Sequence, residues 1–116
     1  MKYSGVKSGE IVITKQLPIS MLNRSVVNFA DEAIFCIGGI KCAKRMKYTL
    51  NQVSIFNIQT LKWKEGPKLN IARYNSSSCV LDDFIYTFFG KCKVLKDHVR
   101  VIEKVNARNV MDGVRS

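Results

Sequence analysis

The chain repeats itself at a spacing close to 50 residues, and this repetition restricts its possible folds more than any other feature of the sequence. The segment DEAIFCIGGI, residues 31–40, is matched by DDFIYTFFGK, residues 82–91, 51 positions later. The flanking segments repeat as well, because Arg24 aligns with Arg73 at a spacing of 49. A period of this size indicates a repeat protein in which each unit is one supersecondary element.

The first unit contains four segments typical of short strands. Val53 and Ile55 alternate with Ser54 and Phe56, which predicts a strand with two distinct faces. The predicted strands cover residues 25–29, 33–37, 52–58 and 61–65, and a polar loop is expected between the second and the third, from the two glycines to about residue 51. Four short antiparallel strands in about 50 residues are typical of one blade of a β-propeller.

The first unit resembles a kelch repeat. That family has an apolar strand that ends in two glycines, followed by an aromatic residue and then a tryptophan seven positions later. In this chain Phe56 precedes Trp63 by seven positions, and the segment GPKLNIARYN resembles the link between consecutive blades. The residues that carry the resemblance are Gly38, Gly39, Phe56, Trp63, Arg73 and Gly90. The resemblance implies that Phe56 and Trp63 pack between blades, where each buries about 150–250 Å².

We therefore predict an all-β chain built of four-stranded antiparallel blades of kelch type in an incomplete propeller. The second unit departs from the pattern, because Phe89 replaces one glycine and Asp112 stands where a second tryptophan is expected. The predicted division is an outer strand (10–14) and link of a preceding blade in residues 1–23, a complete blade in 24–72, a second blade without its outer strand in 73–106, and an irregular tail in 107–116.

The number of units has a physical consequence. Closed propellers have about four to eight blades, and stacked repeats need about three for stability. A pair of blades leaves apolar faces and sheet edges open, which favours association. The chain is thus expected to be a fragment or a degenerate copy of a longer propeller, or a subunit completed by self-association.

Two predicted loops are basic, and they are the candidate sites for partner contact. They lie at residues 40–48 and 91–100, in corresponding places of the two units. Their basic residues are Lys41, Lys44, Arg45, Lys47, Lys91, Lys93, Lys96 and Arg100. The kelch resemblance implies a non-enzymatic adaptor or scaffold that binds a protein ligand, and these charges suit an acidic ligand.

A basic nucleic-acid-binding β domain is the alternative function. The net charge of +10, from 19 Lys and Arg against 9 Asp and Glu, permits phosphate binding. However, the aromatic residues fall at strand positions and are expected in the core, rather than exposed among arginines as in single-strand binders. We therefore favour a protein ligand over nucleic acid.

Enzymatic, metal and cofactor functions are not expected. The four cysteines form no CxxC pair, and His98 is the single histidine, so zinc or copper ligand sets cannot be assembled in the usual way. His98 is interpreted as a solvated loop residue with no nucleophile beside it. Cys36 and Cys79 lie in apolar segments and are predicted to be small core residues.

The sequence also bears on location. No run of 18 apolar residues occurs, so no transmembrane helix is predicted. Residues 1–15 lack the apolar segment of a signal peptide. An intracellular, cytoplasmic protein without disulfides or membrane contact is the expectation.

Overall fold

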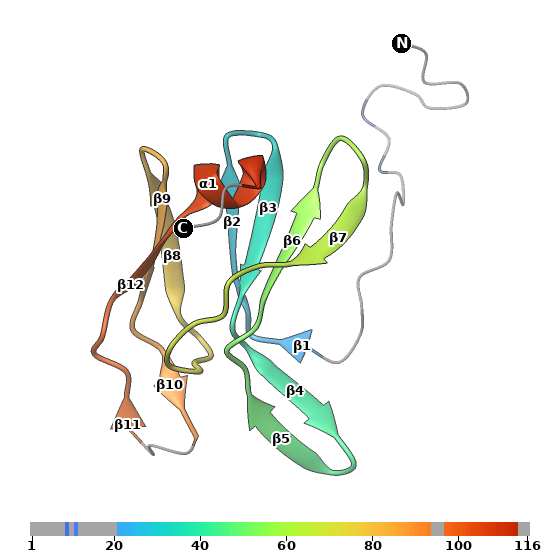
Figure 1. Cartoon of the computed structure of the whole chain (residues 1–116). Coiled ribbons are helices and arrows are strands. Elements are labelled where there is room, and N and C mark those ends of the chain that lie inside the picture. The colour runs from blue at the N-terminus through green and yellow to red at the C-terminus, as the bar shows by residue number, and fades with distance from the viewer. Residues whose placement is uncertain (1–8, 10, 12–20, 94–96, 114–116) are drawn as a thin grey trace.

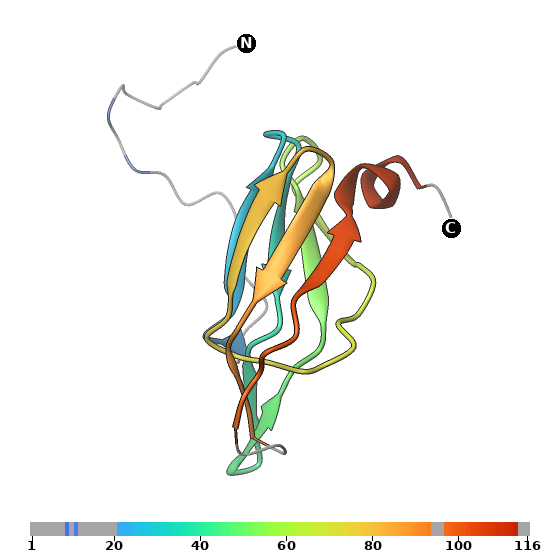
Figure 2. The same ribbon diagram turned by 90° about the vertical axis from the view of Figure 1, so that its left-hand side faces the viewer.

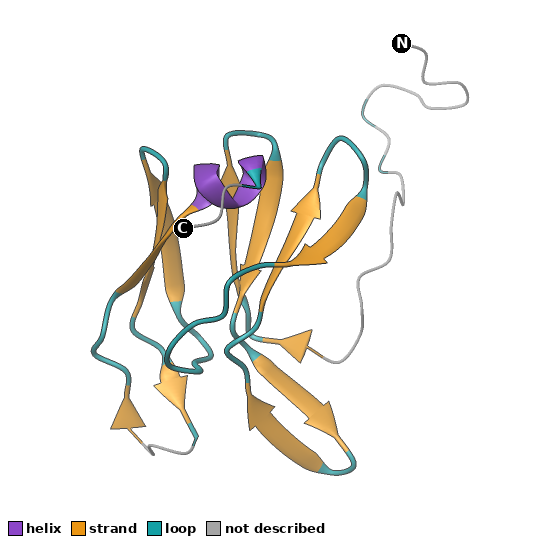
Figure 3. Cartoon of the chain, viewed as in Figure 1, coloured by secondary structure: helices purple, strands orange, loops and turns teal. Residues whose placement is uncertain are grey.

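The computed structural model describes residues 9, 11, 21–93 and 97–113, and nearly all of its regular structure is β (Figure 3). The first unit is a four-stranded antiparallel sheet of β2 (Ser25–Phe29), β3 (Ala33–Ile37), β6 (Val53–Asn57) and β7 (Lys62–Glu65). The strands lie side by side in chain order, β2-β3-β6-β7. All four strands predicted for this unit are confirmed, with their ends shifted by at most one residue.

The second unit is a three-stranded sheet with the same register as the first. It contains β8 (Ser77–Leu81), β9 (Phe84–Phe88) and β12 (Glu103–Asn106) in the order β12-β9-β8. The pair Val27–Phe35 of the first sheet corresponds to Cys79–Tyr86 of the second. With the sheets aligned by these pairs, residues of β8 follow their equivalents in β2 by 52 positions. The corresponding spacing is 51 between β3 and β9, and 49 between β6 and β12. The repeat is therefore a repeat of structure, and no fourth strand follows β12 in the described part of the chain.

The two sheets pack face to face and enclose the hydrophobic core (Figures 1 and 2). Phe29, Phe35 and Ile55 of the first sheet meet Ile85 of the second, and these four side chains are at most 2% exposed. The strands nearest the contact are β2 and β8, where Ser25 Oγ donates a hydrogen bond to Ser78 Oγ at 2.7 Å. Burial of large apolar side chains between the sheets holds the two units together.

The segment predicted as a polar loop after the glycines is a β-hairpin. It contains β4 (Ile40–Ala43) and β5 (Met46–Thr49), and β1 (Met21–Leu22) pairs with β4. The two turn residues, Lys44 and Arg45, have φ of 49° and 65°, as a two-residue type I′ turn requires. Such turns normally carry Asn-Gly, so the Lys-Arg sequence gave no hairpin signal and the loop prediction was wrong.

The corresponding segment of the second unit is also partly paired. It contains β10 (Lys91–Cys92) and β11 (Asp97–His98), which form a two-stranded antiparallel sheet. His98 therefore lies in a strand rather than in a loop, and its side chain is exposed. Lys96 lies outside the described residues.

The tail predicted to be irregular contains a helix, α1 (Ala107–Asp112). The Asn106 side chain caps its first turn by accepting a hydrogen bond from the Asn109 N–H at 3.0 Å, and Gly113 ends it with φ of 75°. Ala107 is fully buried, and Val110 and Met111 pack against the core between the sheets. The second unit thus continues from its third strand into a short helix that covers one end of the core (Figure 1).

Three further predictions have different outcomes. Cys36 is buried as expected, and burial raises the pKa of its thiol, whereas Cys79 is exposed because none of the described residues covers its side of the second sheet. The described part of the chain contains no helix that could cross a membrane. Most of the outer strand and link predicted in residues 1–23 lies outside the described residues.

Candidate ligand-binding end of the molecule

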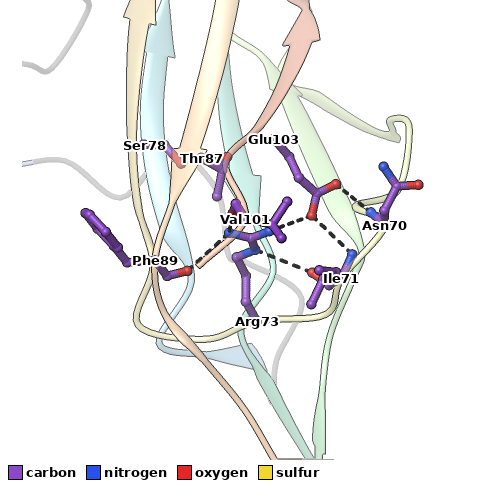
Figure 4. Close-up of polar contacts among 8 residues, drawn as sticks. All are labelled: Asn70, Ile71, Arg73, Ser78, Thr87, Phe89, Val101 and Glu103. Atoms are coloured by element: carbon purple, nitrogen blue, oxygen red, sulfur yellow. Dashed lines mark hydrogen bonds and ion pairs between the residues drawn. The ribbon is translucent and has the colours of Figure 1, made fainter. Parts of the chain in front are cut away.

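Arg73 is buried in the second unit and fixes the loops at its lower end. Its guanidinium is fully buried and donates hydrogen bonds to the carbonyl oxygens of Val101 (2.8 Å), Phe89 (3.2 Å) and Ile71 (3.4 Å), as Figure 4 shows. Nη2 also donates to the carboxylate of Glu103 at 2.6 Å. A single side chain therefore ties the link after β7 to the ends of β9 and β12.

Arg24 performs the same task in the first unit. Its guanidinium donates to the Gly38 carbonyl at 2.7 Å, the Gln52 carbonyl at 3.1 Å and the Ser54 hydroxyl at 3.1 Å. The partners of Arg73 at the corresponding positions are Phe89, Val101 and Glu103. The alignment of Arg24 with Arg73 is thus confirmed in atomic detail, and each arginine sets the base of one hairpin.

Glu103 neutralises the buried guanidinium and is itself held by the backbone. Its carboxylate accepts from the N–H groups of Asn70 (2.6 Å) and Ile71 (3.1 Å), as well as from Arg73. Burial alone raises the pKa of this carboxyl, but the two backbone hydrogen bonds and the arginine together lower its pKa below the usual range. Sequence comparison of the units could not find this role, because the aligned residue is Ser54.

Each second strand leads into its hairpin through two residues with positive φ, and three of these four residues are glycine. Gly38 has φ of 65°, and a Cβ there would lie 2.3 Å from the carbonyl oxygen of Arg73. The corresponding residue of the second unit, Phe89, has φ of 56° and is strained, because a side chain disfavours this conformation. Gly39 and Gly90 follow with φ of 112° and 97°. These glycines therefore lie where the backbone turns from the second strand of each unit into its hairpin.

The two hairpins extend from the same end of the molecule, opposite helix α1 (Figures 1 and 2). The backbone N–H of Lys93 donates to the Thr49 hydroxyl at 3.2 Å, so the hairpins touch. We call this region the basic end and define it as residues 40–49 together with 91–93 and 97–100. Its exposed cationic side chains are Lys41, Lys44, Arg45, Lys47, Lys91, Lys93 and Arg100. The fold therefore gathers both predicted basic loops in one place.

The tip of the first hairpin carries two cations in a strained conformation. Lys44 and Arg45 both occupy the left-handed region, where each residue with a side chain costs about 1–2 kcal/mol relative to right-handed backbone. Positions of this kind are concentrated at functional sites. Strand β5 also forms one edge of its sheet, since the order is β1-β4-β5, and its outer backbone groups are unpaired within that sheet.

The aromatic residues are less buried than predicted. Tyr48 in β5 is 47% exposed and Phe89 is 66% exposed, so the expectation that aromatic residues belong to the core is wrong for both. Phe56 and Trp63 pack on each other with ring centroids 5.0 Å apart. They lie on the face of the first sheet turned away from the second, so the predicted packing between units does not occur within the described part of the chain.

The site offers surface charge and backbone hydrogen bonds. Among the described residues, no group of three or more His, Cys, Asp or Glu side chains could hold a metal ion. No protein-family model and no curated protein matches the sequence.

Proposed function

We propose that the chain is a non-enzymatic interaction module of kelch type whose basic end binds an acidic, extended protein segment. The observation that carries this proposal is the contact between the two hairpins, which brings seven exposed cationic side chains to one end. Carboxylates of a ligand would be attracted to this field, which favours association and orientation more than tight affinity. The glycine pair and the contact between Phe56 and Trp63 support the kelch assignment.

The open edge of β5 favours a peptide as the ligand. An extended peptide can pair with the free N–H and C=O groups of an edge strand, and its alternate side chains then point to one face. Lys47 lies on this strand, and Lys41 is directly opposite Tyr48 on the adjacent one. A ligand with acidic residues at every second position would place its carboxylates along a single face of the hairpin, beside either Lys47 or Lys41.

Single-stranded nucleic acid is the second candidate, and exposed Tyr48 is the observation in its favour. A base could stack on this ring while the phosphates contact the lysines. We rank this candidate lower because stacking proteins present several aromatic platforms in succession, whereas β4 and β5 carry only Tyr48. Nucleic acid binding would also weaken steeply as salt rises.

The test is a titration of labelled probes against the whole chain. The probes are an eight-residue peptide that alternates Glu and Thr, the same peptide with Lys in place of Glu, and a 15-nucleotide deoxythymidine strand. We expect the acidic peptide to bind more tightly than the other two at 150 mM salt. Equal binding of both peptides would refute the proposal, and tighter binding of the DNA would favour the second candidate.

A pair of matched double variants separates the site from overall charge. Lys44→Asn with Arg45→Gly removes two charges from the tip but supplies the residues that a type I′ turn prefers. Lys62→Gln with Lys68→Gln removes two exposed charges elsewhere. We expect the first variant to bind the acidic peptide about tenfold more weakly, which is about 1.4 kcal/mol, and the second to change little. Equal losses would indicate a net-charge effect without a site.

A further inference from the structure

Each sheet has one face in the core and one open face with large apolar side chains. On the first sheet, the face turned away from the second sheet carries Val26, Ile34, Phe56 and Trp63, and we call it the upstream face. On the second sheet, the face turned away from the first carries Leu81, Phe84, Tyr86 and Phe88, and we call it the downstream face. Val26 is 62% exposed and Leu81 is 60% exposed.

The downstream face is the repeat equivalent of the face that the first sheet presents to the core. Tyr86 corresponds to Phe35, which is fully buried against the second sheet. Phe88 and Leu81 likewise correspond to Ile37 and Phe29. The aromatic rings form a row, since the centroids of Tyr86 and Phe88 are 6.3 Å apart and the rings are stacked. This surface therefore has the composition of an interface, but none of the described residues covers it.

The upstream face is the repeat equivalent of the face that the second sheet presents to the core. Ile34 corresponds to Ile85, which is 1% exposed in the core. Phe56 similarly corresponds to Val105. The contact inside the chain thus joins one face of each type. Among the described residues, one face of each type is left open.

We infer that a second copy of this chain occupies these faces, with the upstream face of one copy packed on the downstream face of the next. The intersheet contact within the chain is the template, so the new contact repeats it and needs no different partner. Such a contact is heterologous, and it closes into a ring or continues as an open filament. With two units in each chain, rings of two to four copies would contain the four to eight units of closed propellers.

Lys104 is where the downstream face differs most from its template. It corresponds to fully buried Ile55, and its ammonium lies 4.6 Å from the centroid of the Phe84 ring. Burial of this charge opposes assembly. Lys104→Ile restores the template residue, and we expect it to lower the concentration of half-assembly at least threefold.

Two single variants test the head-to-tail geometry by analytical ultracentrifugation. We expect the natural chain to form discrete oligomers that dissociate on dilution. Val26→Glu blocks the upstream face and Leu81→Glu the downstream face, so each variant should be monomeric alone. Mixed in equal amounts, they should form a one-to-one dimer, since each keeps the face that the other has lost. Met46→Glu, at an exposed apolar residue of the first hairpin, should assemble like the natural chain.

The result that overturns the inference is a natural chain that stays monomeric at millimolar concentration, or a mixture of the two blocked variants that stays monomeric. Circular dichroism of each variant establishes that it is folded, and both substituted side chains are exposed. Assembly of either blocked variant alone would likewise exclude this geometry.

A cross-linking experiment gives a second, independent test. Ser25 and Ser78 touch within the chain, and their repeat equivalents are Ser77 on the downstream face and Val26 on the upstream face. With Cys42 and Cys79 changed to serine, the variant carrying Ser77→Cys and Val26→Cys should give a ladder of disulfide-linked chains on mild oxidation. Ser25→Cys with Ser78→Cys in the same background should close within one chain and serve as the positive control. The inference would be overturned if the control variant formed its disulfide and the test variant gave no ladder.

Discussion

The replacement Glu103→Gln tests whether the buried arginine organises the second unit. The side chain of Glu103 is 11% exposed, and that of Arg73 is fully buried. The variant leaves a guanidinium in the interior without its counter-ion and weakens two backbone hydrogen bonds to a charged acceptor. Loss of one partner from a buried ion pair costs about 3–5 kcal/mol, and we expect about 3 kcal/mol because glutamine keeps one acceptor.

Urea unfolding measures this loss through the fluorescence of Trp63, the single tryptophan of the chain. With an unfolding entropy of about 2.1 cal/mol/K per residue, about 3 kcal/mol corresponds to a fall in melting temperature of roughly 12 °C for this chain. All samples are compared at one protein concentration, since assembly stabilises the folded state by mass action.

The matched control is Glu32→Gln, which breaks the ion pair between Glu32 and Arg108. That pair is much more exposed, with side chains 40% and 32% accessible, so its loss should be small. Equal destabilisation by the two variants would refute the reasoning from burial. A loss below about 1 kcal/mol for Glu103→Gln would also contradict it, because that is the range of exposed pairs.

Three other predictions can be checked on the same instruments. The lowered pKa of folded Glu103 means that its stabilisation is complete above the unfolded carboxyl pKa of about 4.3 and is lost as the pH falls through the lower folded value. The stability difference between the natural chain and Glu103→Gln should therefore be constant near neutral pH and shrink below about pH 4. Phe89→Gly should stabilise the chain by about 0.5–1 kcal/mol, because relief of a left-handed side chain outweighs the entropy of glycine; a less stable variant would contradict this. Asn106→Ala should cost about 1 kcal/mol by removing the cap of α1, whereas Asn106→Ser should restore most of it.

The sequence predicted the strands because their pattern is local and strong. Alternation in 53–57 and the apolar runs at 33–37 and 84–88 define strands without tertiary information, and the repeat gave their order. The missing fourth strand of the second unit was also predictable, since Asp112 stands where the tryptophan was expected.

The predictions failed where an element was too short to show a periodic pattern, where its turn residues were unusual, or where burial depended on tertiary packing. Helix α1 has six residues, too few for a helical period, and only Asn106 and Gly113 mark its ends. The hairpin after the glycines was not predictable from the sequence because Lys44 and Arg45 are unusual turn residues. Cys79 was placed in the core by its apolar neighbours, although nothing in the described part of the chain covers its side of the sheet.

The two arginines show how burial changes the chemistry that a repeated position needs. Arg73, between the sheets, is paired directly with a carboxylate, as a charge removed from water requires. Arg24, on the open upstream side, contacts the Ser54 hydroxyl, which in turn donates to the carboxylate of Glu65 at 3.2 Å. Partial burial already lowers the pKa of Arg24, and a second copy packed on this face would bury it further. Glu65, which Arg24 reaches through the Ser54 hydroxyl, would then serve as its counter-ion. Glu103 plays this part for Arg73 within the chain.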